Sequence, residues 1–256
     1  MRASRNRDIR LYGVMALAFI ASVAATITWC ESMSAMPGMR MPGGWSMTMT
    51  WMRTPGQTWL AAGGTFLAMW TFMMAAMMLP TFAPVLRRFQ RRGHRRAMQA
   101  ISLATGYFGV WAAVGLLLFP IGVGFNALAM RNEMLSKVTP LLGALVVMIA
   151  GALQFMSWKT RALARCRHEE GCCDAWWGKP RDALPVGMRL GLKCAYCCAP
   201  LTAVLLVTGV MELVVMALIT IAISSERLAR SVAVVRMVGV GMLISGIVLV
   251  RRAMLI

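Results

Sequence analysis

Acidic residues and histidine are scarce in this chain of 256 residues. It has nine Asp and Glu residues and two His, against 27 Lys and Arg, which gives a formal net charge of +18. The sequence has no P-loop, no DxxD-type pair of carboxylates and no His-rich segment suited to haem or dinuclear iron. With no catalytic base or nucleotide motif in evidence, we expect a protein that is not an enzyme.

Apolar residues are abundant instead. They make up 59% of the chain, and the mean hydropathy is positive, which is typical of integral membrane proteins. We predict an all-α fold, a polytopic helical membrane bundle that forms a single domain over residues 1–256. Six segments meet the length of about 20 residues that a membrane-crossing helix needs: 11–30, 59–82, 101–125, 140–158, 198–223 and 232–250.

Basic residues are grouped between these apolar segments. The first ten residues hold four arginines, 87–96 holds six, and the Cys-containing loop 159–193 holds eight Lys and Arg. Short cytoplasmic loops of membrane proteins collect Lys and Arg. We therefore expect a multi-pass protein in a bacterial-type inner membrane with both termini in the cytoplasm. The expected surroundings are the lipid bilayer, and no nucleic acid partner is expected.

The predicted outer loop, residues 31–58, is rich in methionine. Thioethers are soft, neutral donors, so spaced methionines among Gly, Pro, Ser and Thr suit the exchangeable capture of Cu(I). Packing of these side chains on a partner or on the lipid surface is the alternative. The methionines are Met33, Met36, Met39, Met41, Met47, Met49 and Met52.

The segment 193–216, KCAYCCAPLTAVLLVTGVMELVVM, contains three cysteines with C-x-x-C-C spacing. In a helix Cys194 lies one turn from both Cys197 and Cys198, so two or three sulfurs can converge on one ion. Such thiols suit Cu(I), with zinc as a second candidate. The alternative is that they serve as small apolar side chains in a tight helix interface.

A second group of candidate ligands follows in the same segment. Met211, Glu212 and Met216 lie near a predicted membrane interior, where a carboxylate usually faces a partner, a cavity or an ion. A continuous helix rises about 20 Å from Cys198 to Met211. The cysteines and this second group therefore form two separate stations unless the chain breaks between them.

The segment 59–82 carries a matching set of methionines. It is predicted to run antiparallel to 198–223, which gives it candidate ligands at both depths. We expect Met77 or Met78 to approach the cysteines, and Met69 or Met73 to approach Glu212. A methionine stripe by itself is more often core packing than a metal site.

Cys166, Cys172 and Cys173 lie with His168 in the basic loop 159–193. Their C-x-H-x3-C-C spacing is not one of the standard zinc patterns. We interpret them as solvated, reduced thiols in the cytoplasm.

Several motifs resemble the DUF2182 family of predicted metal-binding integral membrane proteins. The resemblance implies a multi-span helical protein that binds metal, with copper as the usual assignment and no established reaction. This chain departs from the family pattern at Glu212, where the family has Asn, which places a titratable group at a neutral position. The matching stretches are AMMLP at 76–80, CAYCC at 194–198, GVMELVVM at 209–216, Glu226-Arg227, Gln154, Lys159 and Cys166-Arg167.

The leading hypothesis is an inner-membrane protein that acquires, holds or passes Cu(I) through Met and Cys sites, with a membrane complex or a periplasmic metallochaperone as partner. Transfer between similar soft sites needs only ligand exchange. One alternative is a non-catalytic assembly or structural subunit of a larger membrane complex, whose methionines pack helices. Another is a membrane thiol oxidoreductase that uses Cys194 and Cys197 as its redox pair.

Overall fold

The fold is helical, as predicted. The computed structural model describes residues 2–34, 39–40, 45–47, 51, 53, 56–91, 96–171, 183–210, 212–229 and 231–255. Within these ranges the only strands are two antiparallel pieces of two residues each, β1 (Met39–Arg40) and β2 (Ser46–Met47). The predicted all-α class is confirmed.

Six of the described helices are long and apolar enough to cross a membrane, which indicates a membrane protein. They are α1, α2, α3, α4, α6 and α8. Two shorter helices, α5 and α7, are also described. The helix bounds are α1 (Arg2–Ser34), α2 (Trp59–Arg91), α3 (Arg96–Arg131), α4 (Glu133–Leu153), α5 (Ser157–Gly171), α6 (Ala183–Thr208), α7 (Leu213–Leu228) and α8 (Val232–Met254).

The prediction of one continuous helix over 198–223 is wrong. The chain breaks at Gly209, whose φ of +123° lies in the region that glycine adopts without steric cost. Hydropathy did not reveal the break, because the residues on both sides are apolar. The helix also begins earlier than predicted, at Ala183, so the cysteine motif lies in the middle of α6 and not at its start. The predicted fourth segment, 140–158, is also interrupted, since α4 ends at Leu153 and α5 begins at Ser157.

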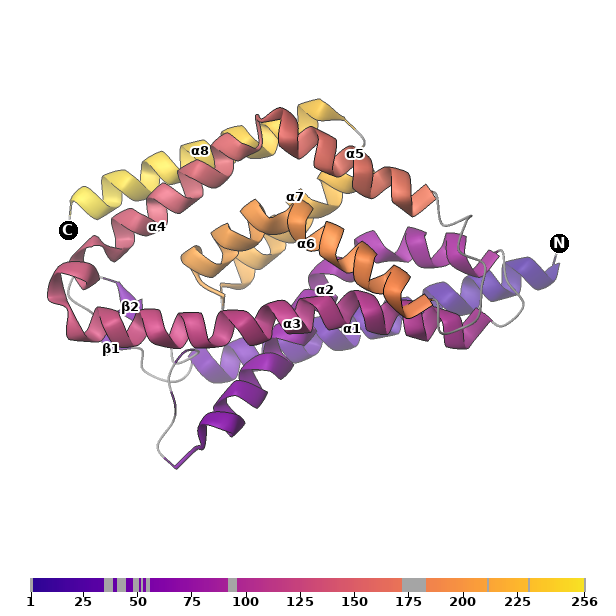
Figure 1. Cartoon of the computed structure of the whole chain (residues 1–256), viewed down its shortest axis with the longest axis horizontal. Coiled ribbons are helices and arrows are strands. Elements are labelled where there is room, and N and C mark those ends of the chain that lie inside the picture. Colours follow the sequence, from indigo (N-terminus) through magenta and orange to yellow (C-terminus); the bar gives the residue numbers. More distant parts are fainter. Residues whose placement is uncertain are drawn as a thin grey trace.

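After the break α7 runs back along α6, so the two helices form an antiparallel hairpin (Figure 1). The return brings Glu226, near the end of α7, beside Lys159 of α5, at the level of Cys197 in α6. The reversal makes α7 a separate short helix, which the prediction had joined to the preceding segment. The start of α1 and the end of α8 lie at opposite ends of the molecule (Figure 1).

Backbones come into close contact where α3 crosses α6. A Cβ atom at Gly106 of α3 would lie 2.3 Å from a backbone oxygen of α6, and one at Gly187 would lie 2.2 Å from a backbone oxygen of α3. Gly187 and Gly191 have the GxxxG spacing that permits such close helix packing. The crossing brings Tyr107 of α3 next to Cys194 of α6.

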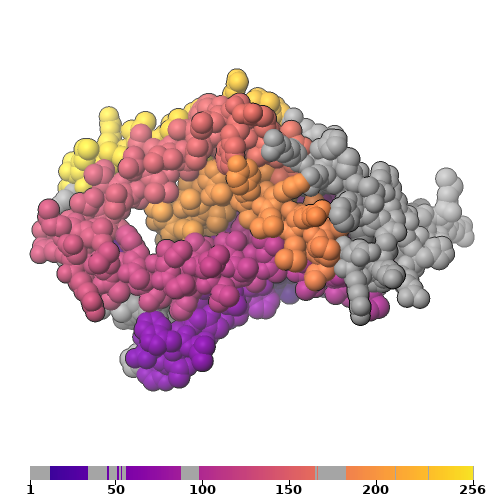
Figure 2. All heavy atoms as spheres, in the orientation of Figure 1, coloured from indigo at the N-terminus to yellow at the C-terminus, as the bar shows by residue number. Residues whose placement is uncertain are grey.

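The helices α4 and α8 pack on each other and form one flank of the molecule (Figure 1). Figure 2 shows an opening on this face between α4 and the α6–α7 hairpin. The apolar core that contains the cysteines is built chiefly from α2, α3 and α6. The candidate site thus lies away from this flank.

Candidate metal centre

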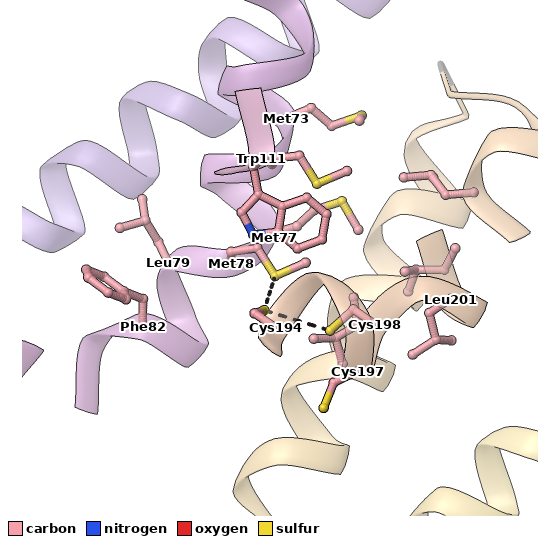
Figure 3. Close-up of a cluster of buried hydrophobic side chains, with 14 of the residues drawn as sticks. Met73, Met77, Met78, Leu79, Phe82, Trp111, Cys194, Cys197, Cys198 and Leu201 are labelled. Carbon is pink, nitrogen blue, oxygen red and sulfur yellow. Dashed lines mark hydrogen bonds between the residues drawn. The ribbon is translucent and has the colours of Figure 1, made fainter. Parts of the chain in front are cut away.

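Two of the three motif cysteines face α2. Cys194 and Cys198 are about 40° apart around the axis of α6 and their Sγ atoms are 4.0 Å apart. Cys194 Sγ lies 3.8 Å from Met78 Sδ on α2, which confirms the expectation that Met77 or Met78 approaches the cysteines. Figure 3 shows these three sulfur atoms grouped between the two helices, with Cys197 directed away from them. All three side chains are buried.

Aromatic residues of α3 form a wall of this sulfur group. The Tyr107 hydroxyl lies 3.0 Å from Cys194 Sγ and donates to it. Trp111, one turn further along α3, is buried, and its carbonyl oxygen accepts a hydrogen bond from the indole N–H of Trp70 on α2. The site is therefore enclosed by side chains from three helices.

The methionines of α2 extend from this group along the helix. Figure 3 shows Met73 and Met77 beyond Met78, on the side away from the cysteines. Their side chains face the protein core and not the outer surface of the bundle, and each is at most 4% exposed. The five are Met69, Met73, Met74, Met77 and Met78.

The spacing of these sulfur atoms fits ligation of a metal ion, and the donor set favours a soft monovalent one. Two ligands about 2.3 Å from one ion, at the tetrahedral angle, have sulfur atoms about 3.8 Å apart. The separations of 3.8 and 4.0 Å around Cys194 are close to that value. Within the described ranges no three or more His, Cys, Asp or Glu residues are arranged so that they alone could hold a metal ion. Zinc sites are usually built from four Cys and His ligands, whereas two thiols with a thioether are typical donors for Cu(I). The donor set therefore favours copper and does not support zinc.

Cys197 faces the opposite way, toward α5. Its Sγ lies 2.8 Å from Cys166 Sγ, and the Cys166 thiol also approaches the carbonyl oxygen of Lys193 at 3.3 Å. Both thiols are buried, so the interpretation of Cys166 as a solvated thiol is wrong. The hydrogen bond from Cys197 lowers the pKa of the Cys166 thiol, Arg227 acts in the same direction, and burial opposes them. Cys172 and Cys173 lie outside the described residues.

A buried ion pair lies on the same side of α6. Lys159 Nζ is 3.0 Å from Glu226 Oε2 and donates to the carbonyl oxygen of Cys197 at 2.7 Å. The Lys159 side chain is 1% exposed, so this lysine is not a surface topology signal as predicted. The next residue, Arg227, donates to the Thr81 hydroxyl of α2 at 3.2 Å. These bonds join α2, α5, α6 and α7 around the cysteine motif.

The second predicted station is less compact than the first. Glu212 is exposed at the start of α7, and its carboxylate acts electrostatically on Cys30 of α1. Met216 and Met69 are buried. Met211 lies outside the described residues, as do most methionines of the predicted outer loop. The role of this second group as a metal site stays a prediction.

Sequence reasoning missed several residues of the centre. Tyr107 and Trp111 have no spacing that links them to the cysteines, because they come from another helix. Lys159 was predicted as a basic loop residue and Glu226 entered only through the family resemblance, so their separation in sequence concealed the ion pair. Glycines at 187 and 191 were the one available signal, but they were assigned to a loop.

The fold and this centre define a helical membrane protein with a buried group of thiol and thioether donors. A family model described as PpoB2, copper chaperone, matches residues 67–249, and the chain belongs to this copper chaperone family. The match supports the copper-related function that the resemblance to DUF2182 implied, without bearing on that family name. No curated protein and no solved structure matches the chain.

Proposed function

We propose that this protein holds Cu(I) between α2 and α6 and passes it to a partner by ligand exchange. Cys194, Cys198 and Met78 are the proposed ligands. Copper is the cargo, and exchange between similar soft ligands needs neither a catalytic base nor a nucleotide. The protein is accordingly proposed to be a carrier and not an enzyme.

The single observation that carries this proposal is the convergence of three sulfur atoms from two helices. Met78 Sδ and Cys198 Sγ lie 3.8 and 4.0 Å from Cys194 Sγ, in a fully buried environment. A thioether remains neutral at any pH, so it contributes a donor without adding charge to the apolar core. Membership of the copper chaperone family supports copper as the ion.

The buried methionines of α2 suggest the route by which the ion reaches this site. Met69, Met73 and Met77 succeed one another at intervals of four residues, about 6 Å along the helix axis. Each is buried toward the core. Stepwise exchange along them would connect the Met78 site with the side of the membrane where the methionine-rich segment 31–58 is proposed to collect Cu(I). Glu212 and Met216 are proposed to assist at that end.

The distribution of charge supports an orientation in the membrane. α2 ends at Arg91 and α3 begins at Arg96 at the end of the molecule where α1 begins (Figure 1), and the sequence 87–96 holds six arginines. Because Lys and Arg collect on the cytoplasmic side, we propose that this end faces the cytoplasm of a bacterial-type inner membrane. The opposite end, with segment 31–58, would then meet a periplasmic metallochaperone or another membrane protein as partner.

Copper analysis of the purified protein tests the proposal. The full chain in detergent, reduced and loaded with Cu(I), is expected to retain about one copper per chain at the proposed site. The double variant Cys194→Ser/Cys198→Ser should lose most of this copper in competition with a Cu(I) chelator. Cys30→Ser, which removes another buried cysteine, is the matched control and should bind like the wild type. Copper-free wild-type protein, or unchanged affinity in the double variant, would refute the proposal.

A further inference from the structure

The second sulfur pair, Cys166 with Cys197, lies outside the proposed copper site. The two Sγ atoms are 2.8 Å apart, and the Cys197 sulfur is directed away from Met78 (Figure 3). Cys197 and Cys198 are neighbours in sequence but point about 100° apart around α6. The two faces of one C-x-x-C-C motif therefore hold two different sulfur groups.

The spacing of this pair differs from that of ligands on one ion. Two sulfurs about 2.3 Å from an ion would be about 3.8 Å apart, so this pair would have to separate by about 1 Å to hold one. A disulfide bond is about 2.05 Å long, which requires an approach of about 0.8 Å. Both side chains are buried, and the Cys166 thiol also contacts the carbonyl oxygen of Lys193 in α6 at 3.3 Å, which holds it close to this helix.

We propose that Cys166 and Cys197 form a reversible disulfide, and that this redox site works independently of the copper site. Hydrogen peroxide, a small neutral oxidant, is a suitable co-reactant for buried thiols. The thiolate of one cysteine attacks a peroxide oxygen, the O–O bond breaks, and the products are a sulfenic acid and water once the leaving hydroxide takes up the thiol proton. The second thiol then attacks the sulfenic sulfur and expels water. In total two thiols and one peroxide give one disulfide and two waters, and a thiol reductant reverses the bond.

The positions of the two residues determine what this bond would do. Cys166 belongs to α5 and Cys197 to α6, and α7 is attached to both through the Lys159–Glu226 ion pair. A disulfide would fix these three helices to one another. Cys194, Cys198 and Met78 lie on the other face of α6, so their thiols and thioether stay available for copper. The statement that copper is retained rests on the proposed function, whereas formation of the disulfide does not.

The test is peptide mass spectrometry of the full chain in detergent after treatment with hydrogen peroxide. A Cys172→Ser/Cys173→Ser background removes the two neighbouring cysteines of the loop and leaves five of the seven in the sequence. We expect a cross-link between the peptides of Cys166 and Cys197, a fall from five to three titratable thiols, and recovery of five after reduction. Further substitution with Cys166→Ala should abolish the cross-link, whereas Cys194→Ser should preserve it.

Cu(I) loading of the oxidised protein tests the independence of the two sites. The oxidised and reduced proteins are expected to retain the same copper per chain. A cross-link that involves Cys194 or Cys198, or the absence of any cross-link, would overturn the redox site. Loss of copper on formation of the Cys166–Cys197 bond would overturn the independence of the sites. If the wild type binds no copper at all, the proposed function fails, while the cross-link by itself still decides whether the redox site exists.

Discussion

The two faces of α6 differ in chemistry although their residues are neighbours in sequence. The face toward α2 and α3 groups Cys194 and Cys198 with Met78 and Tyr107. The face toward α5 and α7 places Cys197 beside Cys166 and the Lys159–Glu226 ion pair. The first face offers two thiols and a thioether at the spacing of metal ligands, and the second offers a closer thiol pair beside a buried ion pair.

This difference shows that a cysteine motif does not by itself define a site. Rotation of about 100° per residue separates adjacent cysteines onto different helix interfaces. What each thiol can do then depends on the partner helix, which supplies a thioether on one side and another thiol on the other. Separate substitution of the two faces should therefore produce separable effects.

The largest effect is expected from breaking the buried ion pair on the charged face. Lys159→Met leaves Glu226 buried without the ammonium group that lies 3.0 Å away, and removing one partner of such a pair costs about 3–5 kcal/mol. The midpoint of thermal unfolding in detergent, followed by circular dichroism, should fall markedly. The double variant Lys159→Met/Glu226→Leu should recover part of the loss.

An exposed ion pair gives the control for this prediction. Lys137 and Glu133 lie 2.8 Å apart on α4 with both side chains largely exposed. Lys137→Met should leave the midpoint nearly unchanged, because water screens exposed charges. Equal losses from Lys159→Met and Lys137→Met would contradict the structural role given to the buried pair.

A smaller effect is expected from separating α3 and α6 on the copper-binding face. Gly187→Leu introduces a side chain where even a Cβ would lie 2.2 Å from a backbone oxygen, and overpacking of this kind costs about 1–3 kcal/mol. The variant should unfold at lower temperature and bind Cu(I) more weakly, because Tyr107 and Cys194 move apart. Gly109→Leu is the control, since a Cβ there would meet nothing within 4 Å. Wild-type behaviour of Gly187→Leu would show that the crossing is looser than described.

Removal of the thioether sharpens the comparison further. Met78→Leu keeps most of the side-chain volume but removes the sulfur 3.8 Å from Cys194, so we expect Cu(I) to bind about tenfold more weakly, or about 1.4 kcal/mol. Competition with a Cu(I) chelator measures the change. Met74→Leu alters another buried methionine of α2 and should leave the affinity unchanged. Equal effects of the two substitutions would argue for packing and against ligation by Met78.

The smallest effect concerns the acidity of Cys166. Its pKa is lowered mainly by the hydrogen bond from Cys197, so more thiolate is present at a given pH than in an ordinary buried cysteine. Alkylation of Cys166 by iodoacetamide should rise at lower pH than that of an ordinary thiol. Cys197→Ala removes the hydrogen bond, raises the pKa and should shift the alkylation profile toward higher pH. Peptide mass spectrometry follows the reaction, and an unchanged profile in the variant would refute this cause.

Much of the helical framework was predictable from hydropathy, but the break at Gly209 was not. Apolar residues continue through the break, and a single glycine in such a run has no distinct hydropathy signal. The early start of α6 at Ala183 was missed as well, because basic residues are interspersed there, and the cysteine motif was therefore placed at a helix end. In contrast, the approach of Met78 to Cys194 was predicted from the antiparallel direction of the two helices and the depth of each residue. Both remain correct when the predicted length of a helix is wrong.

The division of roles within the motif was not predictable. The spacing of Cys194, Cys197 and Cys198 allows each pair one turn apart to converge, and nothing in the segment indicates which pair does so. The interpretation of Cys166 as a solvated thiol was also wrong, because the local sequence does not show which helix packs on it. Its basic neighbours suggested a surface loop, whereas α5 packs it against α6.

The sequence by itself determined a helical membrane protein with soft sulfur donors, because apolar runs of sufficient length must form helices in lipid and because thiols and thioethers share a preference for Cu(I). Only the tertiary structure decided which sulfurs meet. Helix rotation and the close α3–α6 crossing turn Cys194 and Cys198 toward Met78, while the reversal at Gly209 brings Glu226 back to Lys159 beside Cys197. Those choices depend on packing between distant segments, and local spacing carries no information about them.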